Sequence, residues 1–335
     1  MTNNKPPLIA LVGPTAVGKT ATSLAIARAF GCEIISGDSM QVYRGMDIGT
    51  AKLPLAQREG VPHHLIDIRD PAEPFSAADF QTACEEAIRD IHGRGRIPFI
   101  VGGTGLYVES VCYGFRFQPS GGDPAFREAM QALAERDGPE ALHRKLAAVD
   151  PASAAKLHPN DMRRVIRALE IRETTGLPAS EQLGEARGDR KESPYNLALI
   201  GLHMERARLY ERIEERVDAM LAQGLAEEVR GLLEAGLPSS AVSMQALGYK
   251  EMAAYIEGRA TYAEAADTLK RDTRRFAKRQ LSWFRHMQDL IWVDADPEAK
   301  NSELLQTIYA IIAGKFGLSL EYIRTQEING DGGYR

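Results

Sequence analysis

The chain has 335 residues, of which 44% are hydrophobic and 26% charged, and its net charge is −5. These values are normal for a globular protein of about two subdomains, and they exclude a global positive field for binding nucleic acid. No run of eighteen apolar residues occurs, so we expect no membrane span. The three cysteines are scattered and form no CxxC pair, which indicates reduced thiols in the cytoplasm rather than disulfides or zinc.

The first part of the chain alternates short apolar runs with amphipathic stretches. Strands are expected at Leu8–Val12, Cys32–Ser36, around Leu65-Ile66 and at Ile97–Val101, with helices at Lys19–Phe30 and Phe75–His92. Strands that alternate with helices predict a doubly wound α/β domain with a parallel sheet.

The pattern changes after about Phe117. Residues 118–123 read as a Pro/Gly/Ser linker, Pro124 to Thr175 as helical, and Gly184 to Ser193 as an exposed loop. A returning strand is expected at Leu197–Leu202, and helices at Arg206–Gln223, Leu225–Glu234, Met244–Glu257 and Tyr262–Gln288. We therefore expect a P-loop α/β core over residues 1–117, an all-helical insertion over 118–194, and completion of the core with C-terminal basic helices over 195–335.

A phosphate-binding motif follows the first expected strand. The match to G-x-x-x-x-G-K-T is Gly13, Pro14, Thr15, Ala16, Val17, Gly18, Lys19 and Thr20. Backbone N–H groups of such a loop, together with the helix N-terminus, bind an anion. Lys19 adds a positive charge, and the Thr20 hydroxyl is a candidate Mg²⁺ ligand. The motif predicts a polyphosphate ligand without specifying a nucleotide.

Two more polar residues follow expected strands. Asp38 comes after the second strand, and Thr104 comes after the strand that ends in Gly102-Gly103. Ligands of open α/β sheets bind beyond the carboxyl ends of strands, so we expect both near the P-loop. The Asp38 carboxylate there is a candidate Mg²⁺ ligand or general base, or else a cap for a following helix.

These residues, with their neighbours, resemble the bacterial tRNA dimethylallyltransferase family. The most specific part of the match is the run from Asp38 to Lys52, which follows the P-loop. Further matches are Pro62–Asp67, Val101–Thr104, His158–Asp161, Arg164, Arg167–Glu170 and Lys278–Gln280, and the whole resemblance extends from Leu8 to Arg285.

The resemblance implies transfer of a dimethylallyl group from dimethylallyl diphosphate to the exocyclic amine of the adenosine 3′ of the anticodon of tRNA. Asp38 would accept the proton of the amine, Thr104 would lie near the reacting centre, and the P-loop and Arg216 would hold the pyrophosphate with Mg²⁺. Residues implied to contact the tRNA are Asp38, Ser39, Met40, Gln41, Thr104, Arg127, Arg163, Arg164, Val165, Ile166 and Arg167.

The C-terminal helix adds a second expected tRNA surface. Lys270 to Arg285 contains seven basic residues and one acid, and several of the basic residues, including Arg274 and Lys278, fall near one helical face. A basic stripe on an acidic protein suits phosphate-backbone binding, although a merely solvated helix face has the same pattern. We expect Arg274 and Lys278 to contact the anticodon stem-loop, and the protein to act as a monomer.

Two other function classes remain open at this point. The P-loop alone favours a small-molecule or nucleotide kinase, which would bind and turn over ATP. A non-catalytic RNA-binding switch would explain the basic helices, but it leaves Asp38 and Thr104 at the P-loop edge unexplained.

Overall fold

The computed structural model describes residues 5–117, 122–181, 192–296 and 301–319. Most of the expected linker at 118–123 and of the expected loop at 184–193 therefore lies outside the described residues. The chain divides into two compact units, one made of Met1–Cys112 with Ser193–Arg335 and the other of Tyr113–Glu192. No helix among the described residues combines the length and apolar character needed to cross a bilayer.

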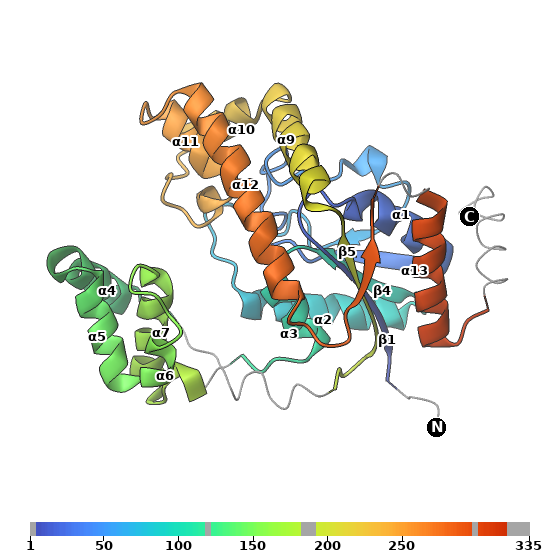
Figure 1. The fold of residues 1–335 in the computed structure, drawn as a ribbon, viewed down its shortest axis with the longest axis horizontal. Coiled ribbons are helices and arrows are strands. Elements are labelled where there is room, and N and C mark those ends of the chain that lie inside the picture. The colour runs from blue at the N-terminus through green and yellow to red at the C-terminus, as the bar shows by residue number, and fades with distance from the viewer. Residues whose placement is uncertain (1–4, 118–121, 182–191, 297–300, 320–335) are drawn as a thin grey trace. The chain divides into compact units, whose positions relative to one another are not determined.

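A parallel sheet of six strands forms the centre of the first unit (Figure 1). Its order is β3-β2-β4-β1-β5-β6, and every neighbouring pair is parallel. The strands are β1 (Pro7–Val12), β2 (Cys32–Ser36), β3 (His63–His64), β4 (Ile97–Gly102), β5 (Asn196–His203) and β6 (Ile291–Asp294). The expected α/β class with a parallel sheet is confirmed.

Helices cover both faces of this sheet. On one face, α1 (Lys19–Phe30) and α13 (Asn301–Phe316) pack together over inward-facing residues such as Ile9, Leu11 and Ile200. Residues that alternate with these along the strands, such as Leu8 and Ala10, face the other side, where α2 (Ala77–Gly93) and α3 (Gly105–Cys112) contact the sheet. Strands buried on both faces explain the continuous apolar runs of the sequence.

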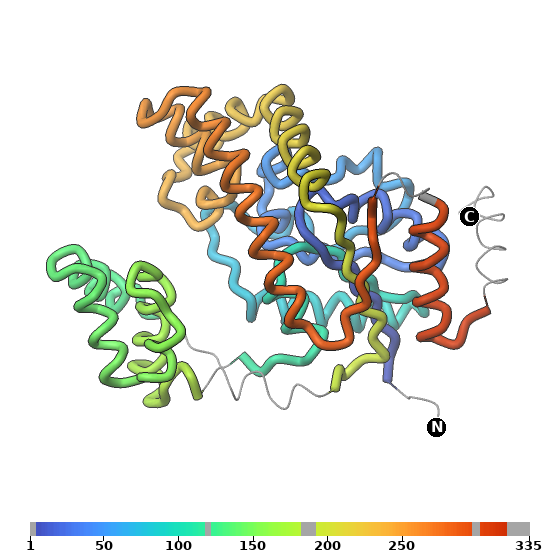
Figure 2. The backbone as a smooth tube through the Cα atoms, viewed as in Figure 1, coloured from blue at the N-terminus to red at the C-terminus, as the bar shows by residue number. Residues whose placement is uncertain are grey.

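Four more helices complete the first unit after β5. They are α9 (Arg206–Ala222), α10 (Leu225–Glu234), α11 (Tyr249–Ile256) and α12 (Tyr262–Phe284). A capping box of Thr261 and Glu264 starts α12, and its buried face repeats at helical spacing from Ala265 to Phe284. The backbone trace shows α12 beside α9, with which it is in contact (Figure 2).

The second unit is entirely helical in the part that the structure describes. It contains α4 (Pro124–Asp137), α5 (Pro139–Val149), α6 (Pro151–Ala154) and α7 (Met162–Thr175). Apolar side chains from these helices, including Leu142, Leu146 and Val165, form a core of their own. Proline at the first turn of α4, α5 and α6 fixes their starts, because it needs no N–H partner there.

The structure differs from the sequence expectations at five places. The edge strand β3 lies at His63–His64, two residues before the apolar pair Leu65-Ile66, because Leu65 has a left-handed backbone (φ 60°) that ends the strand. The expected helix Met244–Glu257 begins only at Tyr249, after a short 3₁₀ turn at Ser243–Gln245. The helix α3, the strand β6 and the helix α13 were not expected from the sequence.

Candidate active site

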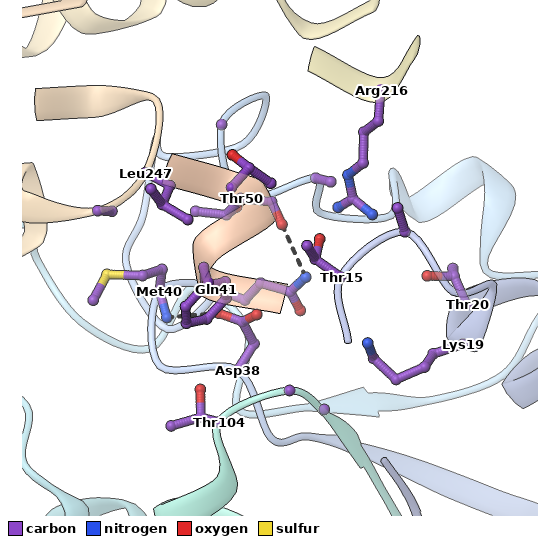
Figure 3. Close-up of a pocket in the computed structure, with 18 of the residues that line it drawn as sticks. Thr15, Lys19, Thr20, Asp38, Met40, Gln41, Thr50, Thr104, Arg216 and Leu247 are labelled. Atoms are coloured by element: carbon purple, nitrogen blue, oxygen red, sulfur yellow. Dashed lines mark hydrogen bonds between the residues drawn. The ribbon is translucent and has the colours of Figure 1, made fainter. Parts of the chain in front are cut away.

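The carboxyl ends of β1, β2 and β4 border a pocket of about 840 Å³ whose lining residues all belong to the first unit. The P-loop follows β1, Asp38 follows β2 and Thr104 follows β4, so the structure brings these three sequence-predicted groups together (Figure 3). Helices α9 and α12 supply the opposite wall, with Arg216 and Gln280 among its residues.

The P-loop is a tight turn between β1 and α1. Gly18 has φ 105°, a conformation that favours glycine, and it is the residue immediately before α1. Lys19 donates hydrogen bonds from Nζ to the carbonyl oxygens of Gly13 (2.8 Å) and Pro14 (2.7 Å). Thr15, Gly18, Lys19 and Thr20 line the pocket, with the first turn of α1 at its edge.

The charges around Lys19 favour an anion. Burial and, to a smaller extent, the neighbouring Arg216 lower the pKa of Lys19 to about 7, although Asp38 opposes the shift. Burial also lowers the pKa of Arg216, against the effect of Asp38, and Arg212 adds to the lowering. A phosphate group bound here would oppose both shifts, because a negative charge favours the protonated cations.

Asp38, in the loop that follows β2, lies beside Thr104, and both side chains bind the backbone of this loop. Asp38 Oδ1 accepts a hydrogen bond from the backbone N–H of Met40 (2.8 Å), and Thr104 Oγ1 accepts one from that of Ser39 (3.0 Å). The residues after Asp38 form turns, so the interpretation of Asp38 as a helix cap is wrong. Its carboxylate is instead held at the pocket, with the Thr104 hydroxyl close by (Figure 3).

Gly102 and Gly103 allow close approach rather than a tight turn. A Cβ on Gly102 would come within 2.2 Å of the carbonyl oxygen of Gly37, so the ends of β2 and β4 are in backbone contact. A Cβ on Gly103 would meet the side chain of Gln280 at 2.2 Å. The pair therefore brings Asp38 and Thr104 together.

Gln280, on α12, is a site residue to which the sequence reasoning assigned no role. Its side chain is buried, donates to the Gly103 carbonyl (2.9 Å) and accepts from the Thr15 backbone N–H (2.9 Å). It thus links the P-loop to the end of β4. Other pocket residues without a sequence-based role are Arg212, Leu247, Lys250 and Arg279. Two of them have a signal in the sequence: Arg212 has helical spacing with Arg216, and Arg279 belongs to the basic run of the last long helix.

The loop residues Met40 and Gln41 also line the pocket. Met40 lies near Leu247, at the end of the pocket away from Lys19 and Arg216 (Figure 3). The side-chain amide of Gln41 is engaged within the loop, because it donates to Thr50 O (3.2 Å) and accepts from Ser36 Oγ (2.8 Å).

In the second unit, the expected tRNA residues fall into three groups. Arg163 and Arg164 are exposed on α7. The guanidinium groups of Arg127 and Arg167 pair with Glu170, whose side chain is fully buried, at 2.7 and 2.5 Å. The side chains of Val165 and Ile166 are buried in the core of this unit, because they lie on the apolar face of α7.

The basic residues of α12 are also of two kinds. Arg274 pairs with Glu214 of α9 at 2.5 Å, whereas Lys278 is exposed and makes no ion pair with any described residue. Arg279 is stacked over Phe276, with its guanidinium carbon 5.8 Å from the ring centroid, and it lines the pocket. The basic stripe is therefore partly neutralised by its neighbours.

No cluster of three or more His, Cys, Asp or Glu side chains that could hold a metal occurs within the described ranges. The Thr20 hydroxyl oxygen, at the pocket edge, is the metal ligand that the P-loop offers. Mg²⁺ commonly takes few protein ligands and fills its octahedron with phosphate oxygens and water, so a single hydroxyl beside a diphosphate site fits this ion.

The chain is similar to known proteins over nearly its whole length. A family model described as IPP transferase matches residues 41–287, and one described as isopentenyl transferase matches residues 6–67. A tRNA dimethylallyltransferase of Bacillus subtilis is 51% identical over 318 residues, which are 95% of this chain and 100% of the relative. One of Symbiobacterium thermophilum is 55% identical over 298 residues, 89% of this chain and 92% of the relative.

Solved structures give the same result. A tRNA isopentenylpyrophosphate transferase of Bacillus halodurans has a TM-score of 0.70 and 47% identity, covering 98% of this chain and 100% of that one. A eukaryotic dimethylallyltransferase acting on tRNA has a TM-score of 0.76 and 32% identity, covering 91% and 78%. Fold, P-loop site and sequence agree, and the chain belongs to the tRNA dimethylallyltransferase family.

Proposed function

We propose that the protein transfers the dimethylallyl group of dimethylallyl diphosphate to the exocyclic amine of the adenosine 3′ of the anticodon of tRNA. The observation that carries this proposal is the meeting of an anion site, at Lys19 and Arg216, with a carboxylate–hydroxyl pair, Asp38 and Thr104, in one pocket. The first pair suits a diphosphate leaving group, and the second suits an amine nucleophile.

The P-loop side of the pocket would stabilise the leaving group. The bond between the allylic carbon and the phosphate oxygen breaks, and pyrophosphate leaves with the electron pair. Lys19, Arg216 and the P-loop N–H groups neutralise the negative charge that develops on it. Mg²⁺, held by Thr20 and the diphosphate oxygens, would supply further charge neutralisation.

The opposite side would orient the nucleophile. The adenosine must leave the base stack for its amine to reach the allylic carbon. Asp38 accepts a hydrogen bond from the amine and takes its proton as the new bond between nitrogen and carbon forms. Thr104, whose hydroxyl lies beside this carboxylate, contributes to positioning the base.

Contacts with the anticodon stem-loop would come from three surfaces. They are the loop Asp38–Gln41, the exposed arginines Arg163 and Arg164 together with the exposed parts of Arg127 and Arg167, and Lys278 with Arg274 on α12. Exposed cations fit RNA phosphates, and the loop borders the pocket. All three cysteines are free and buried, which supports a reducing, cytoplasmic setting.

Transfer of labelled dimethylallyl to unmodified tRNA tests the proposal. Wild type should modify tRNA whose anticodon is followed by adenosine and release one pyrophosphate per transfer, whereas Lys19→Ala should require a much higher donor concentration. ATP turnover with no prenyl transfer would favour the kinase alternative instead. The family comparisons do not favour that alternative.

A further inference from the structure

Helix α7 of the second unit carries a carboxylate, Glu170, on the face that it buries. The side chain of Glu170 is fully buried, and its neighbours Ala168 and Leu169 belong to the apolar core of this unit. A charge in such a place is costly unless it is paired, and a buried ion pair often stabilises a fold no more than well-packed apolar side chains would. The presence of Glu170 therefore suggests a role other than stability.

Two arginines from different helices share this carboxylate. Arg127, on α4, donates from Nε to Oε1 (2.7 Å) and from Nη2 to Oε2 (3.0 Å), which is the bidentate arrangement of a guanidinium on a carboxylate. Arg167, on α7, donates from Nη1 to Oε2 (2.5 Å), and the backbone N–H of Asp123 donates to Oε1 (2.9 Å). Although burial opposes the shift, the hydrogen bonds from Arg127 and Arg167 hold the pKa of Glu170 below its usual value.

The guanidinium of Arg127 is also held on a second side, by Gly122. A Cβ on this glycine would come within 2.6 Å of Arg127 Nη2 and 3.0 Å of its Cζ, so the guanidinium lies directly against Gly122. The side chain of Arg127 nevertheless remains 51% exposed. The bidentate contact uses one edge of the guanidinium, and the N–H groups of its other edges are directed away from Glu170. Arg127 thus presents fixed hydrogen-bond donors at the surface of the unit.

The same surface continues along α7. The side chain of Arg167 is 41% exposed, and the exposed Arg163, four residues earlier, lies on the same face of the helix. Arg127 adjoins this row, because it and Arg167 bind one carboxylate. Guanidinium groups whose orientation is fixed are well suited to phosphate oxygens, which they recognise through several N–H groups at once.

We propose that Glu170 is a positioning residue for the acceptor RNA, which holds Arg127 and Arg167 as a rigid pair that binds a backbone phosphate of the anticodon stem-loop. This inference rests on the proposed function, which supplies the RNA. A surface arginine with no such partner must be ordered when RNA binds, and the lost side-chain freedom weakens the affinity. Glu170 removes this cost, because both side chains are already ordered in the free protein.

Glu170→Gln distinguishes positioning from simple neutralisation, because the two predict effects of opposite sign. If Glu170 only neutralised its partners, the variant would expose more positive charge, bind tRNA more tightly and steepen the salt dependence by about one unit. We expect instead that binding of unmodified tRNA weakens by about 5- to 100-fold, the range for two arginines that must be ordered on binding, without a steeper slope. Filter binding at several salt concentrations, with the full-length protein and no donor, measures both quantities.

The matched control is Glu173→Gln, an exposed carboxylate three residues later on the same helix. It removes the same charge from α7 and should not weaken tRNA binding. In steady-state transfer, Glu170→Gln should raise the KM for tRNA and leave both the KM for dimethylallyl diphosphate and kcat at saturating tRNA unchanged. Partial unfolding would lower kcat instead, so this split separates positioning from a loss of structure.

Gly122→Ala tests the same arrangement without changing a charge. The added methyl group would displace the guanidinium of Arg127 from Glu170, so tRNA binding should weaken while circular dichroism and binding of inorganic pyrophosphate stay as in wild type. This variant decides the question if Glu170→Gln, which places an amide in the core, does not fold.

Tighter tRNA binding by Glu170→Gln, or equal binding by Glu170→Gln and Glu173→Gln, would overturn the proposal. Wild-type binding by Gly122→Ala would do the same. Because binding is measured without donor, the two proposals fail in different experiments. A wild type that binds tRNA but transfers no prenyl group contradicts the proposed function and leaves the role of Glu170 supported by the binding data.

Discussion

Asp38 occupies an unusual position for a carboxylate, because one of its oxygens is already used to fix its own loop. Oδ1 accepts from the Met40 N–H, while the side chain lies at the pocket near Thr104 and two cations, Lys19 and Arg216. Such a group is oriented before substrate binds, as a general base must be. The role of Asp38 as a base can be tested separately from its role in holding the loop. An asparagine at this position retains the oxygen that accepts the hydrogen bond from the Met40 N–H but cannot take a proton.

Asp38→Asn should therefore leave the loop intact and remove the base. We expect the single-turnover transfer rate to fall by about 10² to 10⁴-fold with tRNA affinity little changed. Rapid-quench measurement with saturating donor checks this, and the melting temperature serves as a control for the fold. Recovery of the rate in excess magnesium would instead make Asp38 a metal ligand, and a wild-type rate would exclude it as the base.

At the scale of elements, the loop from Asp38 to Lys52 is held in place by a carboxylate on helix α10. Glu228 of α10 accepts hydrogen bonds from the backbone N–H groups of Asp47 (2.9 Å), Ile48 (2.8 Å) and Gly49 (3.3 Å). It also accepts from the hydroxyl of Tyr249 on α11 (2.6 Å). Because Gly49 lines the pocket, Glu228 connects α10 and α11 to the shape of the site.

Glu228→Gln should loosen this loop, because an amide group cannot accept at both of its ends. Amide hydrogen exchange at residues 47–49 should become faster, and the free energy of unfolding should fall by about 1 to 3 kcal/mol. Mass spectrometry of exchange with peptide resolution provides the measurement. Glu227→Gln, an exposed neighbour in the same turn, should change neither quantity. Equal exchange in both variants would show that Glu228 does not hold the loop.

The helical unit has its own carboxylate anchor in Asp150. This side chain is buried and accepts from the backbone N–H groups of Ser153 (3.0 Å) and Ser180 (2.9 Å), so it ties the start of α6 to the end of the unit. Although burial opposes the shift, these hydrogen bonds lower its pKa to about 2. A carboxyl group whose pKa is lower in the folded state stabilises the fold above its unfolded pKa of about 3.9.

Asp150→Asn should lower the free energy of unfolding by about 1 to 3 kcal/mol at neutral pH, because one N–H would face an amide group instead of an oxygen. The difference from wild type should shrink as the pH falls from about 4 towards 2, where wild type also loses the charge. Urea denaturation across this range measures it, with the exposed Glu128→Gln as control. A difference that does not depend on pH would mean that the charge of Asp150 does not contribute.

At the scale of the whole molecule, a net charge of −5 must be reconciled with binding to RNA. Local clusters of cations have to bind the RNA phosphates. A cation that already forms an ion pair within the protein is less available for such a contact. Lys278 is exposed without a described ion-pair partner, whereas Arg274 is already paired with Glu214. The two residues that the sequence pattern made equivalent are therefore unequal in the fold.

Lys278→Ala should reduce the slope of log affinity for tRNA against log salt by roughly one unit, because one phosphate contact is lost. Arg274→Ala should change the slope less, since Glu214 already neutralises that charge. Filter binding at several salt concentrations distinguishes them. If both variants keep the wild-type slope, the outer face of α12 is only solvated.

Elements that depend on local sequence signals could be predicted, whereas those that depend on contacts between distant residues could not. Buried strands and the P-loop were predictable, because their apolar runs and glycine spacing are dictated by local rules. The edge strand β6, with Ile291 half exposed, has no continuous apolar signal, whereas α13 was missed although its buried residues Ile308 and Ile312 have helical spacing. Gln280 and Glu228 were not predictable as positioning residues, because each acts on a backbone group far away in sequence.

The place of β1 in the sheet has a consequence for synthesis on the ribosome. This strand, which leads into the P-loop, pairs on one edge with β4 but on the other with β5, which emerges only after the whole helical unit has been made. Until then the growing chain carries an unpaired strand edge at the centre of its sheet, while the helical unit has a core of its own and can fold independently. Completion of the nascent sheet therefore waits on contacts of very long sequence separation, the slow kind in folding. Chaperone demand during translation should be greatest between the emergence of β4 and that of β5.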